Sequence, residues 1–293
     1  ALSGLTPTQL GALSPTQASG LTPTQVGALS LLNATQLGSI TSAQIGALTP
    51  TALAALTSTV IGLLTPTQIG GLTSTQASLL TTAQLGGLTS SEIGALSTTA
   101  AKALTATELK ALTTTQIGRL TASELGVLST VQLGALTSSQ IAAFATSALS
   151  GLTTADIASL TTTQLAGVTS SQLGALVTSQ LGALSSVQIG SVTTTALTGL
   201  TTSQIGALTT TQASGLTSAQ IGALGLLSSD QLGAITSAQI GAVTPTALAA
   251  LTSTVLGSLT PAQLGLVSAT QIGALTPTAL SGLTAAQPYP SKP

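Results

Sequence analysis

An eight-residue motif with the consensus Leu-Thr-x-Thr-Gln-Ile-Gly-Ala repeats along almost the whole chain, beginning at Leu5. A short fixed period means that every unit repeats one local structure and buries its apolar face only by stacking on its neighbours. A chain of 293 residues would ordinarily make one or two globular domains, but such an array has no single central core. The motif, which we call the octad and number from its leucine, therefore predicts an elongated repeat architecture.

Polar residues within each octad stand where a short helix needs them in order to begin. Position 2 is Thr or Ser nearly everywhere and position 5 is usually Gln, as in Thr6 and Gln9. Ser/Thr-x-x-Gln is a capping box, in which the hydroxyl and the amide side chain each satisfy a free backbone N–H of the other residue. Apolar residues at positions 1 and 6 then form a hydrophobic staple. Glycine at position 7 is expected to leave the helix with a positive φ.

Proline tests this interpretation independently. All prolines inside the array occupy position 3: Pro7, Pro15, Pro23, Pro50, Pro66, Pro245, Pro261 and Pro277. The first residue after the N-cap suits proline because its missing N–H would be unpaired there anyway. The prolines therefore indicate a helix that begins at position 3 of the octad.

The few charged residues give a second test. Acidic residues occupy position 5 and basic residues positions 7 and 8: Glu92, Glu108, Glu124 and Asp156 against Lys102, Lys110 and Arg119. The helix dipole favours acidic residues near the beginning of a helix and basic residues near its end. Because these residues hold nearly all of the charge in one zone, they form a candidate inter-chain or charged contact zone. The simpler interpretation is a solvated surface that aids solubility.

Two other architectures compete with a stack of short helices. A continuous helix conflicts with apolar positions 1 and 6, which recur at steps of five and three residues rather than three and four. A β-solenoid is the stronger alternative, since Thr, Ile and Val favour strands. However, positions 1 and 6 would face opposite sides of a straight strand, and the proline rule has no simple explanation in a sheet. We therefore predict an all-α solenoid of capped one-turn helices, with the β-solenoid as the alternative.

Two insertions of three residues break the register, at residues 29–31 and 224–226. They lie 195 residues apart, and the chain repeats itself at that offset, since residues 52–60 return as residues 247–255. We expect one octad solenoid over residues 1–287, containing this 195-residue super-repeat, and a Pro-rich tail or linker over residues 288–293.

A further period is visible at position 5. Alanine replaces glutamine there at every sixth octad: Ala1, Ala52, Ala100, Ala148, Ala196 and Ala247. This spacing predicts a superhelix in which every sixth unit meets a similar environment. Because six is divisible by both two and three, the number of octads in one coil stays open.

Composition excludes several classes of function. Charged residues make up 3% of the chain, and Cys and His are absent, which removes thiolate and imidazole metal sites. Only four Lys and Arg residues are present, too few to hold a nucleic-acid backbone. Thr, Ser or Gln interrupts every octad, so no stretch of about 20 apolar residues could span a membrane. We expect no catalytic residues, no metal, no cofactor and no enzyme activity, since no nucleophile–base pair or phosphate loop is present.

Octads of the form Leu-Thr-Thr-Thr-Gln-Ile-Gly resemble the Leu-Thr-Thr-x-Gln-Val-x-Ala arrays of very large secreted surface proteins of Gram-negative bacteria, which are described as adhesin- or haemagglutinin-like. The likeness covers nearly the whole chain but consists only of a low-complexity motif. The two insertions and the Pro-rich tail depart from it. The resemblance implies an extracellular or cell-surface stalk, fibre or adhesin and transfers no binding residues.

Near-neutral surfaces with little charge tend to associate. We therefore predict a structural protein that forms or assembles into an extracellular filament, with further copies of itself as partner. The alternative function is an adhesin stalk or a surface that binds glycans. Thr-x-Thr at positions 2 and 4 resembles the pattern of ice-binding solenoids, but the cap already uses the hydroxyl at position 2.

Overall fold

The computed structural model describes residues 2–283, which form short helices joined by extended links and contain no strand. The chain divides into two compact units, Ala1–Leu152 and Thr153–Pro293, which we call the first and the second unit. The predicted all-α solenoid of short helices is confirmed, and the β-solenoid alternative is wrong for this part of the chain. Ala1 and the predicted tail at residues 288–293 lie outside the described residues.

The helices follow the octads closely. The first unit contains η1 Leu2–Gly4, α1 Pro7–Gly11, α2 Pro15–Ser19, α3 Pro23–Gly27, η2 Ala28–Leu31, α4 Ala34–Gly38, α5 Ser42–Ala47, α6 Pro50–Leu53, α7 Ser58–Ile61, α8 Pro66–Ile69, α9 Ser74–Ala77, α10 Thr82–Gly87, α11 Ser90–Ile93, α12 Thr98–Ala103, α13 Ala106–Ala111, α14 Thr114–Ile117, α15 Ala122–Leu125, α16 Thr130–Ala135, α17 Ser138–Ala142 and η3 Thr146–Gly151. The second unit contains α18 Thr154–Ser159, α19 Thr162–Leu165, α20 Ser170–Ala175, α21 Thr178–Gly182, α22 Ser186–Ser191, α23 Thr194–Leu197, α24 Thr202–Ala207, α25 Thr210–Ser214, α26 Ser218–Gly222, η4 Ala223–Leu226, α27 Ser229–Gly233, α28 Ser237–Ala242, α29 Pro245–Leu248, α30 Ser253–Ser258, α31 Pro261–Leu264, α32 Ala269–Ala274 and α33 Pro277–Leu280.

Most of these helices begin with the capping box that the sequence predicts. In α9, the Gln76 N–H donates to Thr73 Oγ1 at 3.2 Å and the Thr73 N–H donates to Gln76 Oε1 at 2.8 Å. The prolines of the array stand within the first turn, at the beginning of their helices: Pro7, Pro15, Pro23, Pro50, Pro66, Pro245, Pro261 and Pro277. One cap departs from the pattern, because Val177 at the N-cap of α21 has no side-chain acceptor.

The glycines at position 7 do not leave the helix as predicted. No described glycine has a positive φ, and Gly62 at the end of α7 has φ −76° and ψ −2°. The expectation was wrong because the helix ends in the right-handed conformation, and the backbone becomes extended at the leucine that begins the next octad, as at Leu48 after α5. Glycine instead permits a close approach of the backbone. A Cβ on Gly62 would lie 2.2 Å from the Gly87 carbonyl oxygen, and one on Gly87 would lie 2.2 Å from that of Ser58.

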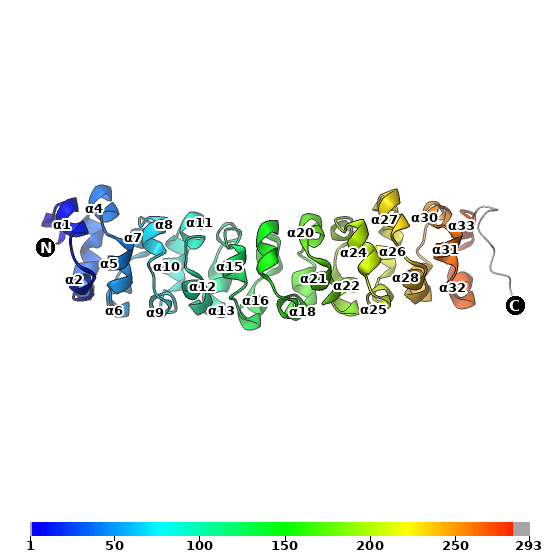
Figure 1. The fold of residues 1–293 in the computed structure, drawn as a ribbon, viewed down its shortest axis with the longest axis horizontal. Coiled ribbons are helices and arrows are strands. Elements are labelled where there is room, and N and C mark those ends of the chain that lie inside the picture. The colour runs from blue at the N-terminus through cyan, green and yellow to red at the C-terminus, as the bar shows by residue number, and fades with distance from the viewer. Residues whose placement is uncertain (1, 284–293) are drawn as a thin grey trace. The chain divides into compact units, whose positions relative to one another are not determined.

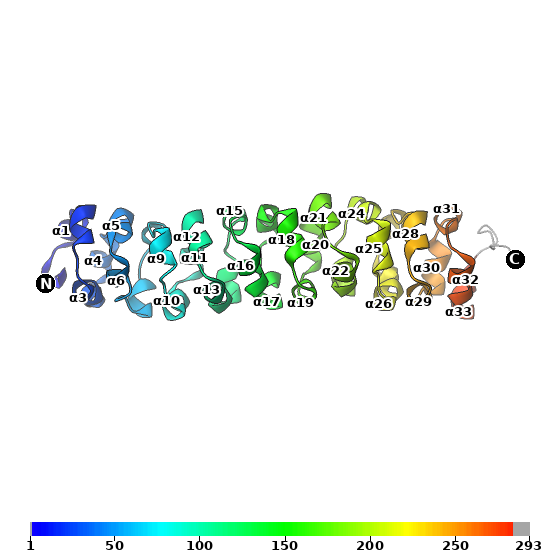
Figure 2. The ribbon, with the colours of Figure 1, turned by 90° about the horizontal axis from the view of Figure 1, so that it is seen from below.

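One coil of the solenoid contains three octads. Within each unit, helices pack against the third helix after them, as α9 does against α12, and these two begin at Ser74 and Thr98. The views of the first unit, coloured blue to green, show these successive coils side by side (Figure 1; Figure 2). The period of six octads is therefore two coils. At one corner of the first unit, α6, α9, α12, α15 and η3 stack in that order, and their position 5 alternates between alanine and a Gln or Glu.

The insertions widen one coil in each unit. In the first unit α1 packs against α4, and these helices begin at Pro7 and Ala34, three residues further apart than in an ordinary coil. The extra residues form η2, in which Leu29 is buried while Leu31 is 70% exposed. In the second unit η4 accommodates the other insertion, between α26 and α27, and Leu226 is 63% exposed. A single 3₁₀ turn therefore absorbs each insertion without changing the octads that follow.

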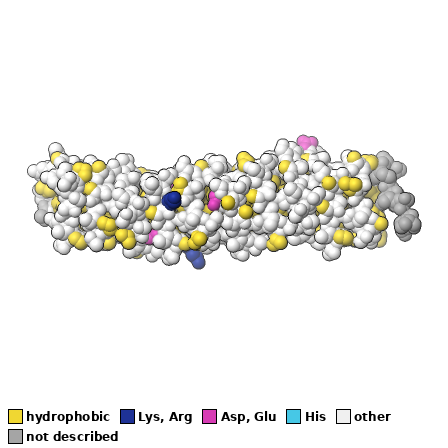
Figure 3. Space-filling view, turned by 60° about the horizontal axis from the view of Figure 1, so that its bottom comes forward, with side chains coloured by type: hydrophobic (Ala, Val, Ile, Leu, Met, Phe, Trp, Pro, Cys, Tyr) yellow, Lys and Arg dark blue, Asp and Glu magenta, His cyan; other side chains and the backbone are white. Residues whose placement is uncertain are grey.

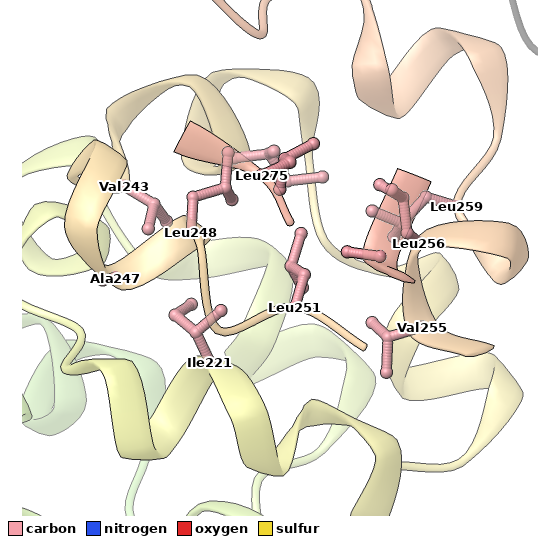
Figure 4. Close-up of a cluster of buried hydrophobic side chains, with 11 residues drawn as sticks. Ile221, Val243, Ala247, Leu248, Leu251, Val255, Leu256, Leu259 and Leu275 are labelled. Atoms are coloured by element: carbon pink, nitrogen blue, oxygen red, sulfur yellow. The ribbon is translucent and has the colours of Figure 1, made fainter. Parts of the chain in front are cut away.

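Apolar side chains at positions 1 and 6 fill the inside of each unit. Leu88 and Ile93 are the staple pair of one octad, and both are buried. Figure 4 shows the corresponding packing in the second unit, where Ile221 from α26 lies beneath Leu248 and Leu251 from the following coil. Among the described residues, no helix has the length and apolar character required to cross a membrane.

Candidate functional site: the glutamine bridge between coils

A helix of one turn is almost entirely made of helix ends. The first four N–H groups and the last four carbonyl groups of a helix have no partner within it, and these helices are four to six residues long. Buried backbone groups that stay unpaired cost as much as a lost hydrogen bond. Each octad therefore needs acceptors at its beginning and donors at its end, and the end is where the sequence offers no obvious partner.

Gln76 shows how both ends are satisfied. Its Oε1 accepts from the Thr73 N–H of its own octad, and its Nε2 donates to the carbonyl oxygens of Ile45 and Leu48, both at 2.8 Å. Ile45 lies in the last turn of α5 and Leu48 is the C-cap residue of that helix. Gln76 is only 1% exposed. One amide thus connects the beginning of α9 to the end of α5, and we call this arrangement the glutamine bridge.

The glutamine bridge recurs in both units. In the second unit, Gln212 Nε2 donates to the carbonyl oxygens of Leu181 and Leu184, both at 2.8 Å. As in Gln76, the acceptors lie 31 and 28 residues earlier. Other glutamines that donate to carbonyls of an earlier coil are Gln36, Gln44, Gln68, Gln84, Gln116, Gln132, Gln140, Gln188, Gln204, Gln220, Gln231, Gln239, Gln263 and Gln271.

The bridge survives the two widened coils. Gln44 Nε2 donates to the carbonyls of Leu10 and Leu13, which lie 34 and 31 residues earlier. Gln239 Nε2 donates to those of Ile205 and Leu208 at the same two offsets. Each offset is three residues longer than in an ordinary coil, which is the length of the insertion. The bridge is therefore defined by the position of the acceptor in its octad and not by a fixed separation along the chain.

Position 5 also holds residues that cannot complete the bridge. Ala100 at the corresponding position of α12 is fully buried and has no side-chain donor. Glu92, Glu108 and Glu124 keep the first half of the arrangement, because each carboxylate accepts from the N–H of its own N-cap residue. An ionised carboxylate has no proton to donate to the carbonyls of the earlier coil. In agreement with this, Glu124 Oε1 is buried without a hydrogen-bond partner.

The charged residues that the sequence groups together separate in the structure. The acidic ones are buried: Glu92, Glu108, Glu124 and Asp156, the last in the second unit. The basic ones are exposed: Lys102, Lys110 and Arg119. The zone is therefore not a single exposed patch, because position 5 faces the neighbouring coil while positions 7 and 8 face outward here. An inter-chain contact by the three basic residues stays a prediction.

The exposed surface carries few charges. Apart from the three basic residues, the exposed charged side chain in the described part is Asp230. Figure 3 shows one face on which uncharged side chains predominate, with separate hydrophobic side chains between them. Within residues 2–283, no group of three or more acidic, His or Cys residues could hold a metal ion.

The role of glutamine as a donor to the earlier coil was not predicted from the sequence. The available signal was the preference for glutamine over glutamate at position 5, since glutamate would serve the capping box equally well.

Short capped helices stacked in coils of three octads define a repeat-array protein. A family model described as the ALTTAQ repeat matches residues 149–186 of the chain. No curated protein matches it. Among solved structures, the chain is similar to the leucine-rich repeat-containing protein LegL7 from Legionella pneumophila, at 14% identity and a TM-score of 0.20, over 80% of this chain and 79% of that one.

Proposed function

We propose that this chain is a structural protein that forms, or assembles into, an extracellular filament. The glutamine bridge carries the proposal. Amides of the same kind connect successive coils in both units, as those of Gln76 and Gln212 do, so the stack gains stability as coils are added. A stack of this kind has a length set by the number of its repeats and needs no central core. That property suits a mechanical element better than a binding pocket.

The low surface charge supports lateral association of such stacks. Charge repulsion keeps most proteins apart in solution, and a net charge near zero promotes association. Here the formal net charge is −1, and the acidic side chains Glu92, Glu108 and Glu124 are withdrawn into the coil interfaces. Threonine and serine cover much of the remaining surface, so two stacks can meet away from the few exposed charges, Lys102, Lys110, Arg119 and Asp230, without burying them.

Extracellular placement rests on the resemblance to secreted surface arrays, and the proposed partners are further copies of the same chain. The ALTTAQ match at residues 149–186 agrees with a repeat array and assigns no ligand. Electron microscopy of the purified chain at rising concentration tests the proposal. We expect uniform filaments whose length or width grows with concentration, and dispersed particles of single-chain mass at all concentrations would contradict it.

A matched set of variants separates assembly from folding. Thr67, Thr115 and Thr211 are exposed and stand at position 4 of their octads. Replacing all three with lysine adds like charges to the surface without touching the coil interfaces, and we expect filaments to disappear while the helical circular dichroism stays unchanged. Replacing the same three with serine is the control and should leave filaments intact. If the lysine variant assembles as well as the native chain, lateral packing is not the mechanism.

A further inference from the structure

The widened coil of the second unit contains an apolar cavity of about 70 Å³ that is partly open to solvent. Its walls include Leu208, Leu216, Ile221, Leu224, Ile235 and Leu248. Figure 4 shows part of this wall, where Ile221, Val243, Leu248 and Leu251 converge. Gln239 also lines the cavity, but its amide is engaged with the carbonyls of Ile205 and Leu208 and with the Thr236 N–H. The wall therefore offers no free polar group.

Two features of the sequence create the cavity together. The insertion enlarges the coil by three residues, so that position-1 leucines such as Leu208 and Leu216 are only partly buried, whereas Leu72 in an ordinary coil is 3% exposed. In addition, Ala213 occupies position 6, where most octads carry Ile or Leu, and it lines the cavity. The larger ring and the smaller side chain therefore coincide at this cavity.

The same combination recurs in the first unit. The widened coil there encloses a smaller apolar cavity of about 20 Å³, lined by Leu13, Ala18, Leu21 and Ile40 among others. Ala18 stands at position 6, as Ala213 does. Ala77 stands at position 6 in an ordinary coil and is fully buried, as Ala18 and Ala213 also are. Each widened coil thus combines a three-residue insertion, an alanine at position 6 and an apolar cavity.

We propose that the widened coil of the second unit is a binding site for a small apolar molecule. Cavities whose walls offer no free polar group stay dry, because water needs polar partners, and such cavities accept xenon or small hydrocarbons. The volume of about 70 Å³ exceeds the 10–15 Å³ or so that a single water-sized guest requires. The wall at η4 provides a route of entry: none of its residues is buried, and a Cβ on Gly225 would meet only Val255 Cγ2, at 3.6 Å.

Xenon NMR on the full chain tests the proposal. The native chain should shift the xenon resonance in proportion to protein concentration. Ala213→Leu fills the cavity and should abolish that shift. Ala77→Leu is the matched control, because it makes the same change at the same octad position in an ordinary coil of the first unit, and it should retain the shift. Circular dichroism establishes that each variant is folded.

Deletion of the insertions provides a second, independent pair of variants. Removing residues 224–226 returns the coil of the second unit to three plain octads and should abolish xenon binding. Removing residues 29–31 makes the same change in the first unit and should preserve it. If Ala213→Leu does not fold, the two deletion variants test the proposal in its place. The proposal is overturned if the native chain does not shift the xenon resonance, or if binding persists without residues 224–226.

Discussion

Gln76 Nε2 donates to the carbonyl oxygen of Ile45 at 2.8 Å, across 31 residues of sequence. Ile45 lies near the end of one short helix, and Gln76 belongs to the first turn of another. The bond therefore gives a carbonyl at a helix end a second donor, beside the Leu48 N–H at 3.2 Å. One-turn helices consist mainly of ends. Because this bond recurs along the chain, it pairs the end of one helix with the beginning of another and so joins the coils.

Replacing Gln76 with glutamate should destabilise the chain. The carboxylate keeps the capping box but cannot donate to the carbonyls of Ile45 and Leu48, which stay buried. The Ile45 carbonyl keeps the Leu48 N–H as a donor, but the Leu48 carbonyl loses its hydrogen bond from Gln76, and a buried acceptor left unpaired costs about 1–3 kcal/mol. We expect a loss of that size in the free energy of unfolding, measured by denaturant titration. Gln17→Glu is the control, because Gln17 is exposed and its hydrogen bonds stay within its own octad. Equal effects at the two sites would contradict the bridge.

The reverse change at Glu124 should stabilise the chain. Glu124 is 2% exposed and its Oε1 has no hydrogen-bond partner. By the offsets of the other bridges, an amide here reaches the carbonyls of Ile93 and Leu96. We expect Glu124→Gln to raise the free energy of unfolding by about 1–3 kcal/mol, the usual penalty of an unpaired buried group. Asp230→Asn removes a carboxylate from the exposed surface and should change stability by less than about 0.5 kcal/mol. A destabilised Glu124→Gln variant would refute this account.

A methyl group at Gly151 should force two coils apart. A Cβ there would lie 1.9 Å from the carbonyl oxygen of Ala122, which is backbone and has little freedom to move. Overpacking of this kind costs about 1–3 kcal/mol, so Gly151→Ala should lower the melting temperature. A Cβ on Gly134 in α16 would meet no atom of a neighbouring coil within 4 Å. Gly134→Ala should therefore be neutral or stabilising by up to about 1 kcal/mol, and the opposite order of the two variants would show that close approach is not the reason for glycine.

Restoring a hydroxyl at residue 177 should strengthen one helix. Val177 holds the N-cap of α21, is 55% exposed and has no side-chain acceptor. Threonine there would accept from the Gln180 N–H, and an N-cap of this type contributes about 0.5–2 kcal/mol. Val187→Thr makes the same substitution at a 70% exposed position inside α22 and should have little effect. Thermal unfolding of both variants measures the difference, and a gain at Val187 alone would argue against capping.

The local half of the fold could be predicted from the sequence because it depends on residues within one octad. Thr73 and Gln76 are three residues apart, and their reciprocal hydrogen bonds follow from helix geometry alone. Pro66 at the start of α8 and Glu92 in the first turn of α11 obey the same local rules. A positive φ at position 7 would follow if each helix ended alone, but Gly62 is constrained by the backbone of Gly87 in another coil.

The octad sequence by itself determined where each helix begins, which side chains cap it and which positions are apolar, since these properties arise within eight residues. Only the tertiary structure decided that three octads make a coil, that Gln76 donates to Ile45 and Leu48, and that Glu92, Glu108 and Glu124 are buried. The physical reason is distance along the chain. A period of six octads fits coils of two or three equally well, and what settles the choice is the packing of side chains and carbonyls 24 to 31 residues apart, which no local pattern encodes.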